Sequence, residues 1–397
     1  PMAQDKDLKT PNIPPLRFPG FSDEWRKTTL GNNCEIQMCK RILAQQTNPD
    51  DGVPFFKIGT IGGKPDAYIS SELFNQFKEK YNYPQKGEVL ISCAGTVGRC
   101  VRFDGKPAYF QDSNIVWPRN NQNTYTNDFL YYILSKQNWR HLNTTTIIRI
   151  YNDDLRSLKF SHPSIEEQQK ITSLLSAIDK RIATQNKIID NLQSLIKGLA
   201  KTHYDFCKTL SSVKIRELGE PYSVMNLSKE QLSDNGQPCI LYGELFTLYG
   251  PVIESICSKT NIELKLSLSS GKDLLFPSST TVNALSLIAP SALTKPNIIL
   301  GGDMFGIKVA NEYSPEYLSY YFNYIGKHEL AKYAIGSTII HLHYKDIAEH
   351  TIAIPSLIDQ LSFVKLASTM KSKIENEKFV LHNLKTLKAY LLQAMFI

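Results

Sequence analysis

Two long stretches of the chain carry apolar residues at alternating steps of three and four positions, which is the seam spacing of a coiled coil. The seam positions are Ile171, Leu175, Ile178, Ile182, Gln185, Ile189 and Leu192 in the first stretch, and Phe363, Met370, Ile374, Glu377, Leu381 and Leu384 in the second. Gln185 and Glu377 interrupt the apolar pattern at matching places, and Lys388 is a further imperfection in the second seam. The pattern predicts two helices, over 164–207 and 356–397, each roughly 60 Å long at about 1.5 Å per residue.

The two predicted helices belong to an internal repeat. From about residue 144, the second half of the chain aligns with the first half, without gaps, at an offset of 192 residues. Thr146-Ile147-Ile148 then aligns with Thr338-Ile339-Ile340, and Pro163-Ser164-Ile165 aligns with Pro355-Ser356-Leu357. A register that persists through both a loop and a helix indicates two copies of one unit rather than chance similarity.

The parts before the helices are more divergent and predict two mixed α/β domains. Short strand-like runs punctuated by Gly and Pro occupy 55–58, 89–92 and 114–117 in the first copy, and 240–242, 273–276 and 298–300 in the second. Short helices are expected over 127–135 and 315–325. The predicted division is a tail over 1–13, globular domains over 14–163 and 208–355, and long helices over 164–207 and 356–397.

Each long helix needs a partner that covers its apolar stripe, and the other copy is the obvious one. We expect the helices to pair antiparallel about a pseudo-two-fold axis, as a two-helix coiled coil that separates the two globular domains. Gln185 and Glu377 would then lie close together, and they would either fix the register or be exposed where the helices splay apart. Ser164 as N-cap with Glu167 three residues later has the spacing of a capping box.

Composition is consistent with this division and excludes several classes of protein. The chain has 397 residues, 42% of them apolar, so it suits two domains better than one compact core. No apolar 20-residue run and no signal-peptide core is present, so we expect a cytoplasmic protein without a membrane span. The seven cysteines include no C-x-x-C pair, and the net charge of +7 permits a nucleic-acid partner without requiring one.

The sequence contains no convincing catalytic motif. Gly62-Gly63-Lys64 is followed by Pro65, which removes an N–H that a phosphate loop would use. Glu263 and Lys265 have the E-x-K form of a nuclease without an upstream Pro-Asp, and His341 with His343 lacks further metal ligands. Both copies lack a catalytic motif, so we predict a non-catalytic chain that itself binds no cofactor and no metal.

Two divergent domains held apart by a rigid helix pair could read two different DNA half-sites, with the helices setting their separation. The candidate DNA-binding residues are Lys57, Lys64, Arg99, Arg102, Arg119, Arg149 and Tyr151 in the first domain, and Tyr242, Lys259, Lys265, Lys295, His341, His343 and Lys345 in the second. The strongest candidates are Arg149, Lys64, Arg99, Tyr242, His343 and Lys345. The alternatives are a two-headed scaffold that binds other proteins and, more weakly, a nuclease that uses Glu263 and Lys265.

Several motifs resemble one known family. The opening Pro15-Leu-Arg-Phe-Pro-Gly-Phe21, the pair Gly87–Ser92 with Gly95-Thr-Val-Gly98, and the helix entry Pro163-Ser-Ile-Glu-Glu-Gln168 are similar to the specificity subunit of type I restriction–modification systems. The resemblance extends over the chain from about residue 14. It implies that 14–163 and 208–355 are target recognition domains and that the helices are the family's conserved spacers.

The resemblance also implies partners. Members of the family read a bipartite DNA target in a system of DNA methylation and defence against foreign DNA. Two modification subunits supply S-adenosylmethionine-dependent methylation, and two restriction subunits supply ATP- and Mg²⁺-dependent translocation and cleavage. The second copy departs from the pattern, with Ile358 and Asp359 at the helix entry and no G-T-x-G turn after Gly271.

Overall fold

The computed structural model describes residues 11–120, 124–139, 148–207, 210–262 and 267–397. The chain divides into two compact units, one of Pro1–Thr184 with Val380–Ile397 and the other of Gln185–Phe379. Each unit therefore contains one globular head together with about half of each long helix. This division cuts the helices in their middle, whereas the predicted boundaries set the helices apart from the heads, and those boundaries stay a prediction.

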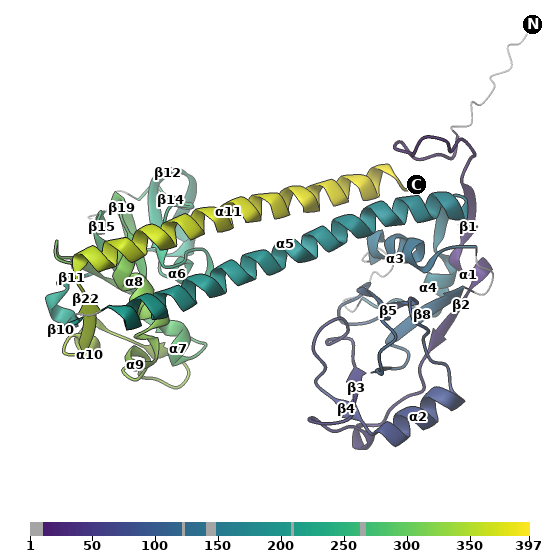
Figure 1. The fold of residues 1–397 in the computed structure, drawn as a ribbon, viewed down its shortest axis with the longest axis horizontal. Helices are drawn as coiled ribbons and strands as arrows, with labels where there is room; N and C mark the ends of the chain where they lie inside the picture. Colours follow the sequence, from purple (N-terminus) through teal and green to yellow (C-terminus); the bar gives the residue numbers. More distant parts are fainter. Residues whose placement is uncertain (1–10, 121–123, 140–147, 208–209, 263–266) are drawn as a thin grey trace, which may run out of the picture. The chain divides into compact units, whose positions relative to one another are not determined.

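The two long helices are α5 (Ile165–Phe206) and α11 (Leu357–Ala394), and their ends differ from the predicted ones by at most three residues (Figure 1). Ser164 Oγ accepts a hydrogen bond from Glu167 N at 3.4 Å. The predicted capping box is nevertheless wrong for Glu167, because its buried carboxylate accepts two hydrogen bonds from Arg17, at 2.7 and 2.8 Å. A buried carboxylate is far better stabilised by a guanidinium than by a neutral amide.

The first head consists of short strands and helices. They are β1 (Arg26–Thr29), α1 (Leu30–Asn33), β2 (Cys34–Met38), β3 (Val53–Phe56), β4 (Tyr68–Ile69), α2 (Ser71–Lys80), β5 (Val89–Ser92), β6 (Cys100–Arg102), β7 (Tyr109–Phe110), β8 (Ile115–Asn120), α3 (Asn127–Lys136), α4 (Asn152–Ser157) and β9 (Lys159–His162). The sheets have the orders β2-β8-β5-β6, β4-β3-β7 and β1-β9. Helix α3 buries Phe129, Leu130 and Ile133 in a core that also includes Leu175 of α5 and Leu391 of α11. Head and helices thus share one core within this unit.

The second head has more strands. It comprises β10 (Leu210–Lys214), β11 (Gly219–Ser223), β12 (Leu232–Leu241), α6 (Glu244–Thr247), β13 (Val252–Ile253), β14 (Ser258–Thr260), β15 (Ser267–Ser270), β16 (Asp273–Pro277), β17 (Ser279–Thr280), α7 (Ala284–Leu287), β18 (Ser291–Leu293), β19 (Pro296–Gly301), β20 (Met304–Val309), α8 (Pro315–Tyr324), α9 (Lys327–Ala331), β21 (Ile340–His341), α10 (Tyr344–Ile347) and β22 (Thr351–Pro355). Its larger sheets have the orders β11-β20-β16-β18-β13 and β14-β12-β19-β15. The fold is mixed α/β, as predicted.

The internal repeat is visible as identical contacts at equivalent residues. Gln168 Oε1 accepts a hydrogen bond from the backbone N of Thr126, the N-cap of α3, at 2.9 Å. Gln360 Oε1 accepts one from Ser314, the N-cap of α8, at 2.9 Å. Each glutamine also donates from Nε2 to the carbonyl of the proline that precedes its long helix, at 3.1 and 2.9 Å. The glutamine of the helix-entry motif is therefore a buried connection between head and helix in both copies.

The seam residues of the long helices are all buried or half-buried. Ile171, Leu175, Ile178, Ile189, Phe363 and Ile374 are fully buried, and Ile182, Leu192, Met370, Leu381 and Leu384 are half-buried. In the second unit, buried Gln185 donates from Nε2 to the backbone carbonyl of Glu377 at 3.2 Å and also contacts its carboxylate. The expected proximity of this polar pair is confirmed.

Candidate nucleic-acid interface

A three-residue segment in each head presents two outward side chains around one buried residue. Ile150 is 2% exposed and Leu342 is fully buried. Because side chains alternate in extended backbone, the flanking residues point the other way, toward solvent. The flanking pair is half-buried Arg149 with exposed Tyr151 in the first head, and exposed His341 with exposed His343 in the second. The positions are equivalent in the repeat, but the chemistry differs.

The two segments are held in place by the same hydrogen bonds. Ile150 N donates to the carbonyl of Cys93 at 2.9 Å, just beyond β5, and Leu342 N donates to the carbonyl of Ser278 at 2.9 Å, just beyond β16. The backbone N of Tyr151 donates to Asp154 at 2.7 Å. The backbone N of His343 donates to Asp346 at 2.9 Å. We name the two outward pairs the recognition edges, Arg149/Tyr151 for the first head and His341/His343 for the second.

The two side chains of each recognition edge lie against each other. The Arg149 guanidinium carbon is 5.8 Å from the centre of the Tyr151 ring, and the His341 and His343 rings are 6.0 Å apart and nearly parallel, at 14°. The planar side chains of Arg, Tyr and His suit hydrogen bonding to base edges, stacking and contact with phosphate. Such a pair on the surface of each head can therefore engage nucleic acid.

The turn between β5 and β6 lies next to the first recognition edge. Gly95 and Gly98 have φ values of +66° and +81°, which favour glycine. A Cβ atom on Gly98 would come within 2.2 Å of the Trp139 ring, so no other residue fits there. Thr96 Oγ1 donates to the carbonyl of Ile58 at 2.7 Å, and Arg99 Nη1 donates to the carbonyl of Ile61 at 3.1 Å. The turn therefore holds the loop that follows β3.

The other predicted basic residues of the first head have different surroundings. Lys64 and Arg99 are exposed, while Lys57 lies 2.9 Å from the Asp66 carboxylate. Arg119 donates to buried Glu88 at 2.9 and 3.1 Å, and this hydrogen bond raises the pKa of Arg119. Arg102 lies 2.6 Å from Asp128 and 3.6 Å from the centre of the Tyr131 ring. The geometry of Arg102 and Arg119 favours a structural role for both side chains.

A groove of about 1,120 Å³ marks the second head. Tyr242, Lys229 and Thr280 contribute to its walls. Ser279 also lines the groove and pairs with His341 in the antiparallel ladder of β17 and β21, so the second recognition edge adjoins the groove. Tyr242 and the two histidines are thus brought into one region.

The remaining candidates of the second head are scattered. Lys259 lines a separate hollow beside Ser233 and Cys257. Lys295 and Lys345 are exposed. Lys265, and with it the nuclease alternative that pairs it with Glu263, lies outside the described residues.

Sequence reasoning missed Thr96 and Gln111, which shape the first site. Gln111 Oε1 accepts a hydrogen bond from the backbone N of Ile58 at 3.2 Å, on the same loop that Thr96 holds. The Gly-x-x-Gly spacing was the only available signal for Thr96, and no local pattern pointed to Gln111.

The described residues include no group of three or more His, Cys, Asp or Glu side chains that could hold a metal ion. Burial raises the pKa of the Cys34, Cys39 and Cys93 thiols to about 12, so they are protonated at neutral pH and are poor nucleophiles. Within the same described ranges, no helix is both long and apolar enough to cross a membrane.

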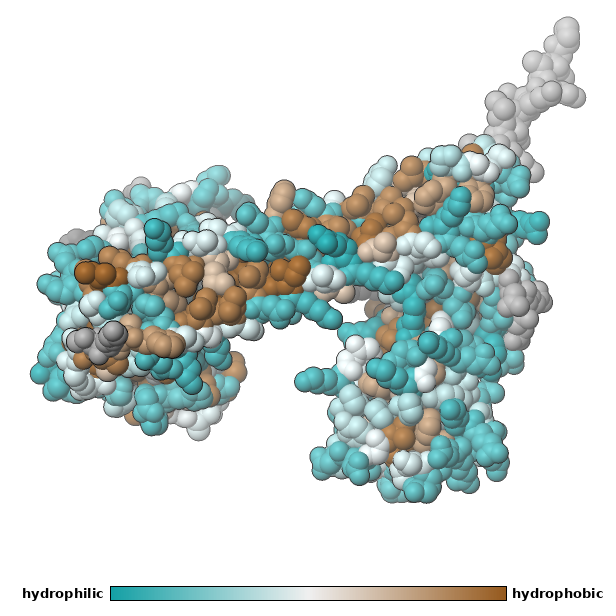
Figure 2. All heavy atoms as spheres, in the orientation of Figure 1, coloured by the Kyte–Doolittle hydropathy of each residue, from teal (hydrophilic) through white to brown (hydrophobic). Residues whose placement is uncertain are grey.

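Helix α11 carries exposed apolar side chains outside its seam. Ile358 is 80% exposed and Leu361 is 52% exposed in the second unit. In the first unit, Leu387 and Tyr390 are also exposed. Figure 2 shows apolar side chains gathered on the surface of the long helices. Exposed apolar side chains of this kind are available for contact with another protein.

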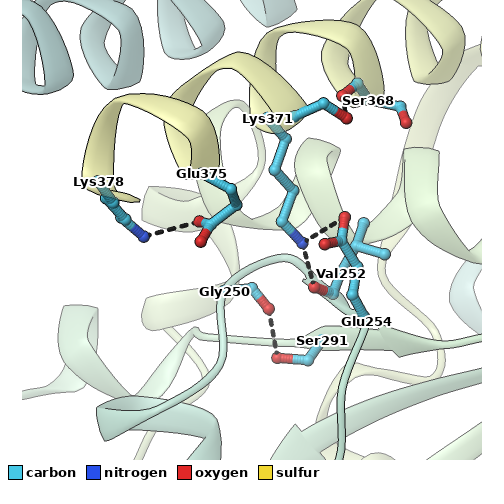
Figure 3. Close-up of polar contacts among 9 residues, drawn as sticks. Gly250, Val252, Glu254, Ser291, Ser368, Lys371, Glu375 and Lys378 are labelled. Atoms are coloured by element: carbon cyan, nitrogen blue, oxygen red, sulfur yellow. Dashed lines mark hydrogen bonds and ion pairs between the residues drawn. The ribbon is translucent and has the colours of Figure 1, made fainter. Parts of the chain in front are cut away.

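The second head is fixed to α11 by a lysine. Lys371 Nζ donates to the carbonyl of Val252 at 2.7 Å and lies 3.0 Å from the Glu254 carboxylate (Figure 3). Lys378 and Glu375 form a separate ion pair along the same helix, at 2.8 Å. The first contact joins head to helix, whereas the second stays within the helix.

Comparison with known proteins gives a consistent result. The sequence model of the type I restriction modification DNA specificity domain matches residues 22–194. A putative type I restriction enzyme specificity subunit of Haemophilus influenzae is 46% identical over 189 residues, which are 47% of this chain and 48% of that protein. The chain thus matches about half the length of this relative. The putative MjaX specificity subunit of Methanocaldococcus jannaschii is 24% identical over 400 residues, covering 89% of this chain and 91% of that protein.

Solved structures show the same fold. The S subunit of a type I restriction–modification system from M. genitalium superposes with a TM-score of 0.60 at 18% identity, over 97% of this chain and 99% of that one. A chain from a structure described as the basis of complex assembly and conformational transition of a type I system gives 0.55 at 14% identity, over 93% and 96%. Residues 22–194 therefore match the type I restriction modification DNA specificity domain, and the chain as a whole is similar in sequence and in fold to type I restriction–modification specificity subunits.

Proposed function

We propose that this chain is the non-catalytic, DNA-reading subunit of a type I restriction–modification complex and that each head reads one half of a bipartite double-stranded target. The observation that carries the proposal is the repeated recognition edge. Arg149/Tyr151 and His341/His343 stand at equivalent positions, held by equivalent hydrogen bonds. One architecture with two sets of side chains is what an asymmetric target requires.

The long helices would set the separation of the two half-sites. In the first unit the head shares its core with the long helices through Leu175 and Leu391, and in the second unit Lys371 of α11 contacts the head directly. A continuous helix is a stiff spacer, so a fixed length of unread DNA would lie between the half-sites.

The exposed apolar face of α11, which includes Ile358, Leu361, Leu387 and Tyr390, would bind the modification subunits. We propose two modification and two restriction subunits in the complex. S-adenosylmethionine, ATP and Mg²⁺ would all be bound by these partners. The chain would act in the cytoplasm together with these partners.

The net charge of the chain suits a complex in which partner subunits supply part of the contacts with DNA. Phosphate contacts supply most of the affinity of DNA-binding proteins, and a net charge of +7 is modest for a chain of 397 residues. The modification subunits would supply further phosphate contacts, whereas the recognition edges would supply the base contacts that select sequence.

Selection from a random duplex pool tests the proposal against the scaffold alternative. The chain, with and without a modification subunit, is used to capture DNA at about 50 mM and about 150 mM salt, and the bound fraction is sequenced. Enrichment of one motif with two specified halves and a constant gap supports the proposal. A bound fraction without any enriched sequence at low salt would favour a protein scaffold.

A further inference from the structure

The loop that follows β3 is fixed near its start and in its middle by side chains of other segments. Thr96 Oγ1 donates to the Ile58 carbonyl at 2.7 Å, and Arg99 Nη1 donates to the Ile61 carbonyl at 3.1 Å. Gln111 Oε1 accepts from the backbone N of Ile58 at 3.2 Å. The loop thus makes three hydrogen bonds to side chains that lie 38 to 53 residues away in the sequence.

The same loop is tightly wound within itself. The backbone N of Ile61 donates to the Lys57 carbonyl at 2.9 Å, and that of Gly63 donates to the Thr60 carbonyl at 2.9 Å. The Ile61 side chain is 1% exposed and packs in the second core cluster of the head. The loop therefore has few alternative conformations, because both its buried Ile61 side chain and the hydrogen bonds from other segments hold it in place.

Two lysines border the loop, and among the described residues only Lys57 has an ion-pair partner. Lys57 Nζ lies 2.9 Å from the Asp66 carboxylate. Lys64 is exposed, and no ion pair engages it within the described part of the chain. The fixed loop therefore presents the exposed ammonium group of Lys64 to solvent.

The turn between β5 and β6 connects this loop to the first recognition edge. Cys93 accepts from Ile150 N, the centre of the recognition-edge segment, and Thr96 follows three residues later and holds the loop. A DNA backbone running past Arg149 and Tyr151 would thus pass the turn and the loop.

We propose that Thr96 and Arg99 are positioning residues that hold Lys64 for contact with a phosphodiester of the DNA backbone beside the first half-site. Arg99 was expected from the sequence to contact DNA itself, but its guanidinium is used to fix the loop. The inference rests on the proposed function and adds to it a phosphate contact and the two residues that orient it. Holding the loop in advance lowers the ordering cost of binding.

A double-mutant cycle on the full-length chain tests the inference, with a duplex that the chain selects from the random pool. Lys64→Ala should weaken binding to all sequences alike, and the loss should be about 3.5 times larger at about 50 mM than at about 200 mM salt, as for one lost phosphate contact. Thr96→Val, which keeps the shape but removes the hydroxyl, should cause a loss with the same salt dependence. In the Lys64→Ala background, Thr96→Val should cause no further loss.

Three controls keep the test specific. Thr96→Ser retains the hydroxyl and should restore wild-type affinity. Lys345→Ala in the second head should act independently of Thr96→Val, so that their effects multiply. Thermal unfolding of each variant identifies any that fails to fold, and Arg99→Met then provides a second route to the same loss.

The outcomes separate this inference from the proposed function. If the effects of Lys64→Ala and Thr96→Val simply multiply, Thr96 does not act through Lys64 and the inference is wrong even though the chain binds DNA. If the wild-type chain selects no duplex at any salt concentration, the proposed function itself fails.

Discussion

Asp179 and Lys371 stand at equivalent positions of the two repeats and carry opposite charges, yet each joins a head to a long helix within its own unit. Asp179 accepts a hydrogen bond from Tyr132 of the first head at 2.8 Å and lies 2.6 Å from Lys388 of α11. Lys371 holds Val252 and Glu254 of the second head (Figure 3). The repeat has therefore kept the position of the contact and reversed its chemistry. If one head were exchanged for the other, its helix-facing groups would meet a side chain of the opposite charge from the one they contact now.

The Asp179 contact should contribute measurably to stability. Asp179→Asn weakens the ion pair with Lys388, and Lys388→Met removes it while keeping the apolar stem. Both side chains are about one-quarter exposed, so we expect a coupling free energy of about 1 kcal/mol or less rather than the larger value of a buried pair. Urea unfolding of both single variants and the double variant gives the coupling, and a value of zero would mean that the pair contributes nothing.

The buried glutamines Gln168 and Gln360 should contribute more to the free energy of unfolding than the Asp179–Lys388 pair does. Gln168→Ala removes the partner of the Thr126 N–H at the start of α3, so we expect a loss of about 2 kcal/mol in the free energy of unfolding. Gln360→Ala should cost a similar amount in the second unit through Ser314. Gln169→Ala, on the exposed side of α5, is the matched control and should change stability by less than about 0.5 kcal/mol. Equal effects of Gln168→Ala and Gln169→Ala would contradict this role.

His162 should make the chain less stable at mildly acidic pH. Burial lowers the pKa of His162 below its ordinary value, with a smaller contribution from Arg26. As the pH falls through about 6.5, the unfolded chain binds a proton that the folded chain resists, so the free energy of unfolding decreases. His162→Gln should flatten the fall in melting temperature between about pH 7.5 and pH 5.5, whereas His382→Gln, at an exposed site on α11, serves as control. If His162→Gln leaves the pH dependence of the melting temperature unchanged, His162 is not the cause of the loss of stability.

The helix pair can be tested as a spacer. Insertion of seven residues into both α5 and α11 keeps the heptad pattern and lengthens each helix by about 10 Å. The lengthened chain should no longer select the wild-type gap between half-sites, as read from sequencing of a captured duplex pool. Selection of the same gap with unchanged affinity would contradict the role of the helices as a spacer.

The elements that were predicted well are those whose signal is local. The heptad pattern gave α5 and α11 within three residues, and the run Val89–Ser92 matches β5. The strand expected over 55–58 instead ends at Phe56, because Lys57 begins the tightly wound loop. The hydrophobic periodicity cannot show where this strand ends, because the turn that follows it is held by hydrogen bonds to Thr96 and Gln111, which are distant in the sequence.

The surroundings of the candidate site residues were harder to predict from the sequence, because they depend on contacts between distant segments. Arg149 and Tyr151 were found because the repeat places His341 and His343 at the same positions, and a repeat can be read from sequence. Arg119 looks like any surface arginine until Glu88, 31 residues away, is brought against it. Glu167 likewise has the spacing of a capping box, and only the folded chain shows that Arg17, 150 residues away, binds its carboxylate.

The most direct test of the account is a comparison of two recognition-edge variants in the duplex selection. One variant carries Arg149→Ala with Tyr151→Ala, the other His341→Ala with His343→Ala, and each is captured on the random pool with a modification subunit and sequenced. Each variant should lose sequence preference in one half of the motif, the two variants should lose opposite halves, and the gap should be unchanged. Variants that both retain the complete wild-type motif would contradict it.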